Sequence, residues 1–153
     1  MKKTVVALLA LLLLFSLTAC GSKTKKTVCT YTSTYGSTNE ITVTSKGSEM
    51  IKVINAITYK GLDPDSAEAN MKDLKASYAF FDDIEGVSTV YKLNNAKDQI
   101  TLSLTIDLQK LDFAAFEKEM GEYYDDPTIA FKADNLDLAK YIDGAESQGY
   151  VCK

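Results

Sequence analysis

Three residue types are missing from the 153-residue chain: histidine, tryptophan and arginine. Without histidine, the chain lacks the most common general base and the only side chain whose ordinary pKa lies near neutrality. Without arginine, it has no planar guanidinium for bidentate binding of phosphate or carboxylate. The formal net charge of −4 also argues against nucleic-acid binding. We therefore expect no enzyme, no catalytic residue, no metal site, no cofactor and no nucleic-acid partner.

Proline and glycine are scarce, with two and eight residues, while 46% of the chain is hydrophobic and 25% is charged. Apart from its N-terminal segment, the chain contains no long apolar run, no internal repeat and no low-complexity stretch. This composition is typical of a globular protein, and the length suits one domain.

The N-terminal segment has the pattern of an export signal. Lys2 and Lys3 precede an apolar run at 5–15, and small residues follow up to Cys20. A retained membrane helix or a buried core helix is the alternative, but the run is shorter than the roughly 20 residues of a spanning helix. We predict a signal peptide at residues 1–19.

The end of this signal, Leu17-Thr18-Ala19-Cys20, resembles the lipobox of bacterial lipoproteins. The resemblance implies a diacylglyceryl group on the Cys20 sulfur, cleavage before Cys20, and acylation of the new amino group by a fatty acid such as palmitate. Several acyl chains together give stable anchoring where one is marginal. Residues 20–26 would form a lipidated flexible tether, and residues 27–153 a single domain at the extracytoplasmic face of the cell membrane. The tether lysines would either attract anionic lipid or be merely solvated.

The rest of the chain predicts an α+β domain, an antiparallel sheet of about six strands with about three helices packed on one face. Alternation in 99–108 puts five apolar residues on one side, starting with Ile100, and Thr101, Ser103 and Thr105 on the other. In 49–59 the same rule places Ile51 inward with Val53, Ile57 and Tyr59. The strands are expected at 27–34, 40–45, 49–59, 87–93, 99–108 and 150–152.

Helical spacing predicts three helices, at 65–82, at 112–123 and after Asn135. Asp63 with Pro64 is one possible start of the first helix, and Asp65 with Glu68, which have the spacing of a capping box, is another. Asn135 is the expected cap of the third helix. Its inward residues would be Leu138, Ala139, Ile142 and Ala145.

Three cysteines cannot all pair within one chain. With Cys20 lipidated, Cys29 and Cys152 remain, and both lie in predicted strands outside the membrane, where disulfides form. We predict a Cys29–Cys152 disulfide between adjacent strands, with Cα atoms about 5.5 Å apart. Two buried free thiols are the alternative.

The remaining polar residues form no recognisable catalytic or metal-binding pattern. Thr101, Ser103 and Thr105 suit a binding surface or plain solvent exposure. Tyrosines at 123, 124, 141 and 150 suit either a groove or partner interface, or a helix or strand boundary at the edge of the core. Acidic residues near 117–126 do not follow the EF-hand pattern, and a solvated helix face explains them better.

The sequence GVSTVYKLNNAKDQITLSLTIDLQKLDF at 86–113 has a strand start, a polar hairpin, an alternating strand and a D-L-x-K-x-D-F exit, in that order. With the preceding helix and the closing GYVCK, it resembles the YehR-type family of small bacterial lipoproteins, whose function is largely unknown. The resemblance supplies no catalytic residues, and since some members lack the cysteine pair, the predicted disulfide rests on the cysteine argument alone.

These observations predict a membrane-anchored extracytoplasmic lipoprotein that acts as a non-enzymatic binding or envelope-interaction module. The alternative is a lipoprotein that captures a small molecule, and an exported enzyme ranks third. The expected partners of this lipoprotein are the membrane, through lipid on Cys20, and a protein or small molecule. A pocket with convergent polar groups would favour small-molecule capture.

Overall fold

The computed structural model describes residues 23–34, 36–121 and 132–153. The predicted signal peptide, Cys20, Tyr123 and Tyr124 lie outside the described residues. No helix in the described ranges is long and apolar enough to cross a membrane.

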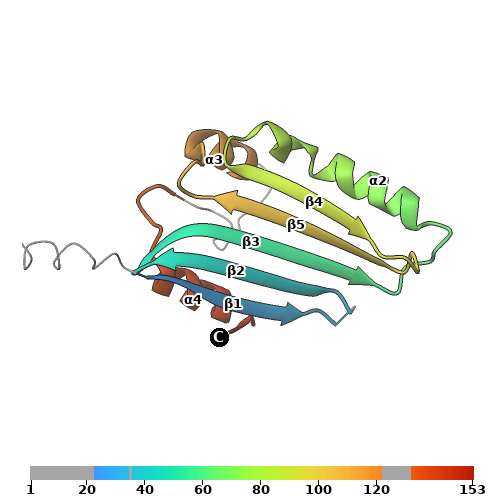
Figure 1. The fold of residues 1–153 in the computed structure, drawn as a ribbon, viewed down its shortest axis with the longest axis horizontal. Helices are drawn as coiled ribbons and strands as arrows, with labels where there is room; N and C mark the ends of the chain where they lie inside the picture. The colour runs from blue at the N-terminus through green and yellow to red at the C-terminus, as the bar shows by residue number, and fades with distance from the viewer. Residues whose placement is uncertain (1–22, 35, 122–131) are drawn as a thin grey trace, which may run out of the picture.

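Six strands form one antiparallel sheet in the order β4-β5-β3-β2-β1-β6 (Figure 1). The helices of the described chain pack against one face of this sheet, which confirms the predicted α+β architecture. The strands are β1 (Thr24–Thr32), β2 (Thr38–Lys46), β3 (Glu49–Lys60), β4 (Val87–Leu93), β5 (Gln99–Asp107) and β6 (Val151–Cys152). The helices are α2 (Ala67–Ser77), a 3-10 helix η1 (Ala79–Asp83), α3 (Phe113–Gly121) and α4 (Leu138–Ser147).

The core lies between the sheet and the helices. Ile100, Leu102, Leu104 and Ile106 of β5 are all buried, as their alternation predicts. From the helix side, Phe81, Phe116 and Met120 are buried against the sheet. Removing these apolar side chains from water is the main stabilising contribution to such a fold.

One strand departs from simple alternation. The register between β2 and β3 shifts at Thr44 and Ser45, so Met50 pairs with Ser45 while Lys52 pairs with Thr44. Met50 and Val53 are both buried although they are three residues apart, and Ile51 is half-buried. The prediction that Ile51 faces the core was therefore wrong, because a β-bulge inserts one extra residue and changes the side to which it points.

The helix ends also differ from prediction. Helix α2 ends at Ser77, and the chain continues as η1 instead of one helix to residue 82. Asp137, not Asn135, caps α4: its Oδ1 accepts a hydrogen bond from the Lys140 backbone N–H at 3.0 Å. Leu138, Tyr141 and Ala145 pack in or against the core, and Ile142 is half-buried. Ala139 is exposed, so the prediction that it points inward was wrong.

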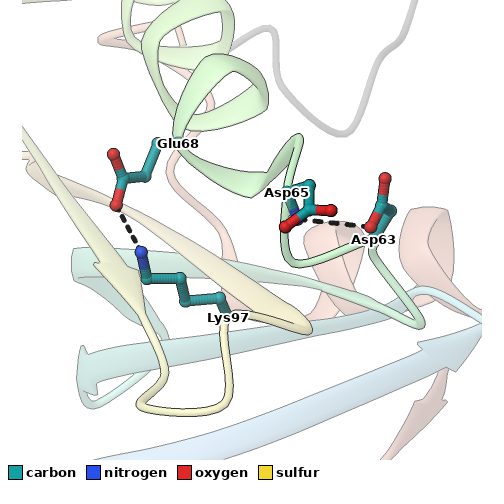
Figure 2. Close-up of polar contacts among 4 residues, drawn as sticks. All are labelled: Asp63, Asp65, Glu68 and Lys97. Carbon is teal, nitrogen blue, oxygen red and sulfur yellow. Dashed lines mark hydrogen bonds and ion pairs between the residues drawn. The ribbon is translucent and has the colours of Figure 1, made fainter.

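The predicted capping box of α2 does not form (Figure 2). Ser66 is the N-cap, and its side chain makes no capping bond. Asp63 Oδ1 instead accepts from the Asp65 backbone N–H at 3.2 Å. Glu68 turns away from the helix start and pairs with Lys97 of the β4–β5 turn, at 2.6 Å between Oε1 and Nζ.

Strand β1 starts before the predicted domain boundary at residue 27. Thr24, Lys25 and Lys26 pair with Lys46, Ser45 and Thr44 of β2. They are therefore strand residues, and not part of a flexible tether. Local sequence could not reveal this, because polar residues enter a strand when a neighbouring strand supplies their backbone partners.

Candidate functional site

The face of the sheet opposite the core is not covered by any helix of the described chain. We call it the helix-free face and define it as the strand positions that alternate with the buried ones. It includes Thr101, Ser103 and Thr105 of β5, which are half-buried. These residues were predicted to lie on the polar side of the sheet, and the structure places them there.

Hydroxyl groups cross this face in register. Thr32, Thr38, Thr58 and Thr101 lie opposite one another on β1, β2, β3 and β5. The hydroxyls of Thr58 and Thr101 are 3.4 Å apart. The tyrosines of the described strands, Tyr31, Tyr59 and Tyr91, alternate onto the opposite face. The helix-free face therefore presents rows of hydroxyl groups and no tyrosine from the described strands.

The charge of this face is opposite in sign to that of the whole chain, which is −4. On the described strands, its lysines outnumber its carboxylates by five to three. Such a local excess attracts anions even when the protein as a whole is acidic. The lysines are Lys26, Lys46, Lys52, Lys60 and Lys92, and the acidic residues are Glu40, Glu49 and Asp107.

A cavity of about 400 Å³ opens on this face beside the β-bulge. Ile51 and Ile54 of β3 supply its apolar surface, and Lys26 and Lys52 supply its positive charge. The remaining lining residues are Thr42, Thr44, Asp107 and Gln109. Sequence reasoning missed this site, because its residues come from four strands and a loop and are brought together only by the strand register.

A second, smaller cavity of about 250 Å³ lies where the β2–β3 turn meets the segment before α4. Glu49, Asp134 and Asp137 contribute carboxylates to it. Asp137 is already engaged as the α4 cap. Within the described residues, no group of three or more acidic or cysteine side chains is arranged to hold a metal ion.

The disulfide between Cys29 and Cys152 joins the first and last strands, as predicted, with Cα atoms 4.0 Å apart. The separation is shorter than the expected 5.5 Å for a reason visible in the backbone. Val28 and Lys153 exchange both of their N–H···O bonds at 2.9 Å, so the cysteines occupy the adjoining non-hydrogen-bonded position. At such positions Cα atoms approach more closely.

Tyrosines 141 and 150 pack against the hydrophobic core on the helix side of the sheet. The Tyr150 hydroxyl accepts a hydrogen bond from Asn39 Nδ2 at 2.6 Å, and its ring lies 5.4 Å from that of Tyr31. Of the two interpretations that the sequence left open, the edge of the core describes both residues.

Two solved structures share this fold. The NMR structure of the Escherichia coli YehR protein superposes with a TM-score of 0.67 at 19% identity, covering 86% of this chain and 92% of that one. The fold is YehR-like. An NMR structure of a protein from Streptococcus pneumoniae TIGR4 gives a TM-score of 0.60 at 18% identity, covering 86% of each chain. No protein-family model and no curated protein matches the chain. At these identities the likeness to YehR extends to the fold alone.

Proposed function

We propose that this protein is a lipid-anchored, non-enzymatic binding module at the extracytoplasmic face of the cell membrane. Its helix-free face contacts an anionic component of the envelope. The observation that carries the proposal is the lysine excess and the rows of hydroxyls on that face, in a chain of net charge −4. Charge complementarity of this kind favours encounter with anionic partners.

The N-terminal sequence supports the anchor. Lys2 and Lys3, the apolar run and the lipobox-like Leu17-Thr18-Ala19-Cys20 precede the domain directly. Since β1 begins at Thr24, covalent geometry limits the Cα distance from Cys20 to Thr24 to at most roughly 14 Å. A lipid on Cys20 would hold the Thr24 end of the sheet, and Lys26 with it, near the bilayer surface.

The disulfide supports export. Bonds of this kind persist in oxidising compartments and are rare in the cytosol, where thiols are kept reduced. Cys29 is fully buried and is bonded to Cys152. An extracytoplasmic location therefore suits the covalent structure of the domain.

Lipid labelling in cells tests the anchor. Cells expressing the chain are fed an alkyne-tagged palmitate, and membrane and released fractions are compared. We expect the wild-type chain and a Ser22→Ala control to be labelled and membrane-bound, and Cys20→Ala to be unlabelled. Label that persists on Cys20→Ala would contradict the proposal.

Site-directed photocrosslinking tests the binding face. A photoreactive amino acid is placed at Ser103 on the helix-free face, with a matched control at Lys72, an exposed position of α2. We expect discrete adducts with an anionic envelope component from position 103 in intact cells and none from position 72. Equal adduct yields at the two positions would contradict the assignment of the face.

The cavity beside the β-bulge favours a second function, the capture of a small molecule. It combines an apolar surface with lysine, hydroxyl and amide groups, as ligand sites do. Both functions use the same face. They differ in whether the partner is small enough to enter the cavity.

A further inference from the structure

The β-bulge creates the cavity by turning one apolar side chain out of the core. Met50 takes the buried place that Ile51 would otherwise fill, and Ile51 lines the cavity together with Ile54. The Ile51 carbonyl accepts a hydrogen bond from the Leu108 N–H at 3.0 Å, which fixes the bulge against the end of β5. Bulges often redirect side chains beside binding sites in this way.

Two lysines stand on either side of a hydroxyl above this apolar surface. Lys26, Thr44 and Lys52 lie opposite one another on β1, β2 and β3. With neighbouring strands roughly 4.8 Å apart, the two lysine backbones are about 10 Å apart. An oxyanion above Thr44 is therefore placed between two flexible ammonium groups. Lysine binds phosphate as a point charge and needs no fixed fork geometry.

Neither lysine forms an ion pair within the described residues. The ion pairs there join Lys97 to Glu68 and Lys132 to Glu117, and none of these four residues lines the cavity. Lys52 is half-buried and Lys26 is exposed. Half-burial of Lys52 without an ionic partner leaves it able to gain from a bound anion.

Asp107 sets a further chemical condition on the ligand. It lies opposite Lys52 in the register of β3 and β5, and its Oδ1 accepts from the Gln109 N–H at 3.2 Å. A carboxylate repels an anion, so the charged group of a ligand belongs between Lys52 and Lys26, on the side of Lys52 away from Asp107. The ligand's hydroxyl or amino groups can then donate to Asp107.

We infer that this cavity binds a phosphate ester whose phosphate lies between Lys26 and Lys52, whose apolar part contacts Ile51 and Ile54, and whose hydroxyl or amino group faces Asp107. The inference deepens the proposed function, since it rests on the helix-free face being the binding surface. The same chemistry belongs to a soluble phosphate ester and to a phospholipid head group.

Binding is measured by methyl NMR on the chain from residue 20 with Cys20→Ala, which contains every described strand and helix. Three probes are titrated: glycerol 3-phosphate, and six-carbon-chain phosphatidylglycerol and phosphatidylcholine below their micelle concentrations. We expect saturable shifts of the Thr42, Thr44 and Ile54 methyls. Binding of glycerol 3-phosphate would show that a soluble phosphate ester is sufficient for binding. Binding of phosphatidylglycerol but not of glycerol 3-phosphate would show that the ligand is a phospholipid.

The variant is Lys26→Gln with Lys52→Gln, and the matched control is Lys60→Gln with Lys92→Gln, which removes the same charge elsewhere on the face. We expect affinity to fall at least tenfold in the variant and to change less than twofold in the control. Unchanged Ile41 and Val43 methyl signals show that the fold is intact.

An equal loss in both double variants, or the absence of saturable shifts with all three probes, overturns the inference. Saturable binding of phosphatidylcholine as tight as that of phosphatidylglycerol overturns it too. If any of these results is obtained but the crosslinks from position 103 persist, the proposed function survives without the phosphate ligand. If the crosslinks are absent as well, both the inference and the proposed function fail.

Discussion

Cys29 and Cys152 lie directly opposite each other on β1 and β6, and their disulfide closes a sequence separation of 123 residues. Strand β6 has only two residues and sits at the edge of the sheet. Because so short a strand forms few backbone hydrogen bonds, the disulfide contributes most to keeping the C-terminus on the sheet.

The first prediction is that Cys29→Ala with Cys152→Ala, in a Cys20→Ala background, lowers the free energy of unfolding by about 2–5 kcal/mol. Urea denaturation measures the change. Thiol titration of the Cys20→Ala parent, denatured without reductant, should detect no free thiol. Two reactive thiols, or unchanged stability of the double variant, would show that the bond does not form in the protein.

The second prediction concerns Gly86, whose φ of +85° precedes β4. A Cβ there would lie 2.7 Å from the backbone of Leu111, and the Gly86 carbonyl accepts from the Asp107 N–H at 2.7 Å. We expect Gly86→Ala to cost about 3 kcal/mol, from left-handed backbone strain plus steric overlap. Thermal or urea denaturation measures it.

Gly61 is the matched control for Gly86. Its φ is +70°, and no atom lies within 4 Å of an added Cβ. We expect Gly61→Ala to cost only about 1 kcal/mol, because strain acts there without overlap. Equal costs at the two positions would refute the argument from close packing.

The third prediction concerns Asn55, which lies between Ile41 and Leu104 in the sheet register. Its Oδ1 is buried and has no hydrogen-bond partner in the described chain. We expect Asn55→Leu to raise the free energy of unfolding by about 1–2 kcal/mol, because an unsatisfied buried acceptor is removed. Asn39→Leu should gain less, since it also deletes the 2.6 Å bond to Tyr150. A less stable Asn55→Leu protein would show that the amide has a partner.

The fourth prediction concerns pH. The hydrogen bond and charge of Lys97 lower the pKa of Glu68 from its ordinary value of 4.5. The resulting stabilisation is present above pH 4.5 and is lost as pH falls through the lowered pKa. Because Glu68 is fully exposed, water screens the effect. Carboxyl NMR should show the pKa of Glu68 rising toward 4.5 in Lys97→Ala, while Lys140→Ala, which removes an exposed lysine of α4, leaves it unchanged. A Glu68 pKa unaffected by Lys97→Ala would exclude the pairing.

Much of the fold follows from local sequence. The alternation of Ile100, Leu102, Leu104 and Ile106 identified the core side of β5, since neighbouring strand residues point to opposite faces. Helical spacing also predicted helices in the regions of α2 and α3. The odd cysteine count and the two strand positions identified the Cys29–Cys152 pair.

Tertiary structure decided what depends on partners distant in the chain. The bulge that turns Ile51 outward exists only because β2 and β3 pair with a shifted register. The early start of β1 likewise depends on pairing with β2. Glu68 pairs with Lys97, which lies 29 residues away in the chain, instead of capping α2.

The candidate site depends on tertiary structure most of all. Sequence placed Thr101, Ser103 and Thr105 on a polar face, but it did not bring Lys26 and Lys52 to either side of Thr44. Side-chain direction along one strand is a local property of the backbone, so sequence determined it. Which side chains become neighbours across strands depends on register, and register is set by the packing of the whole sheet.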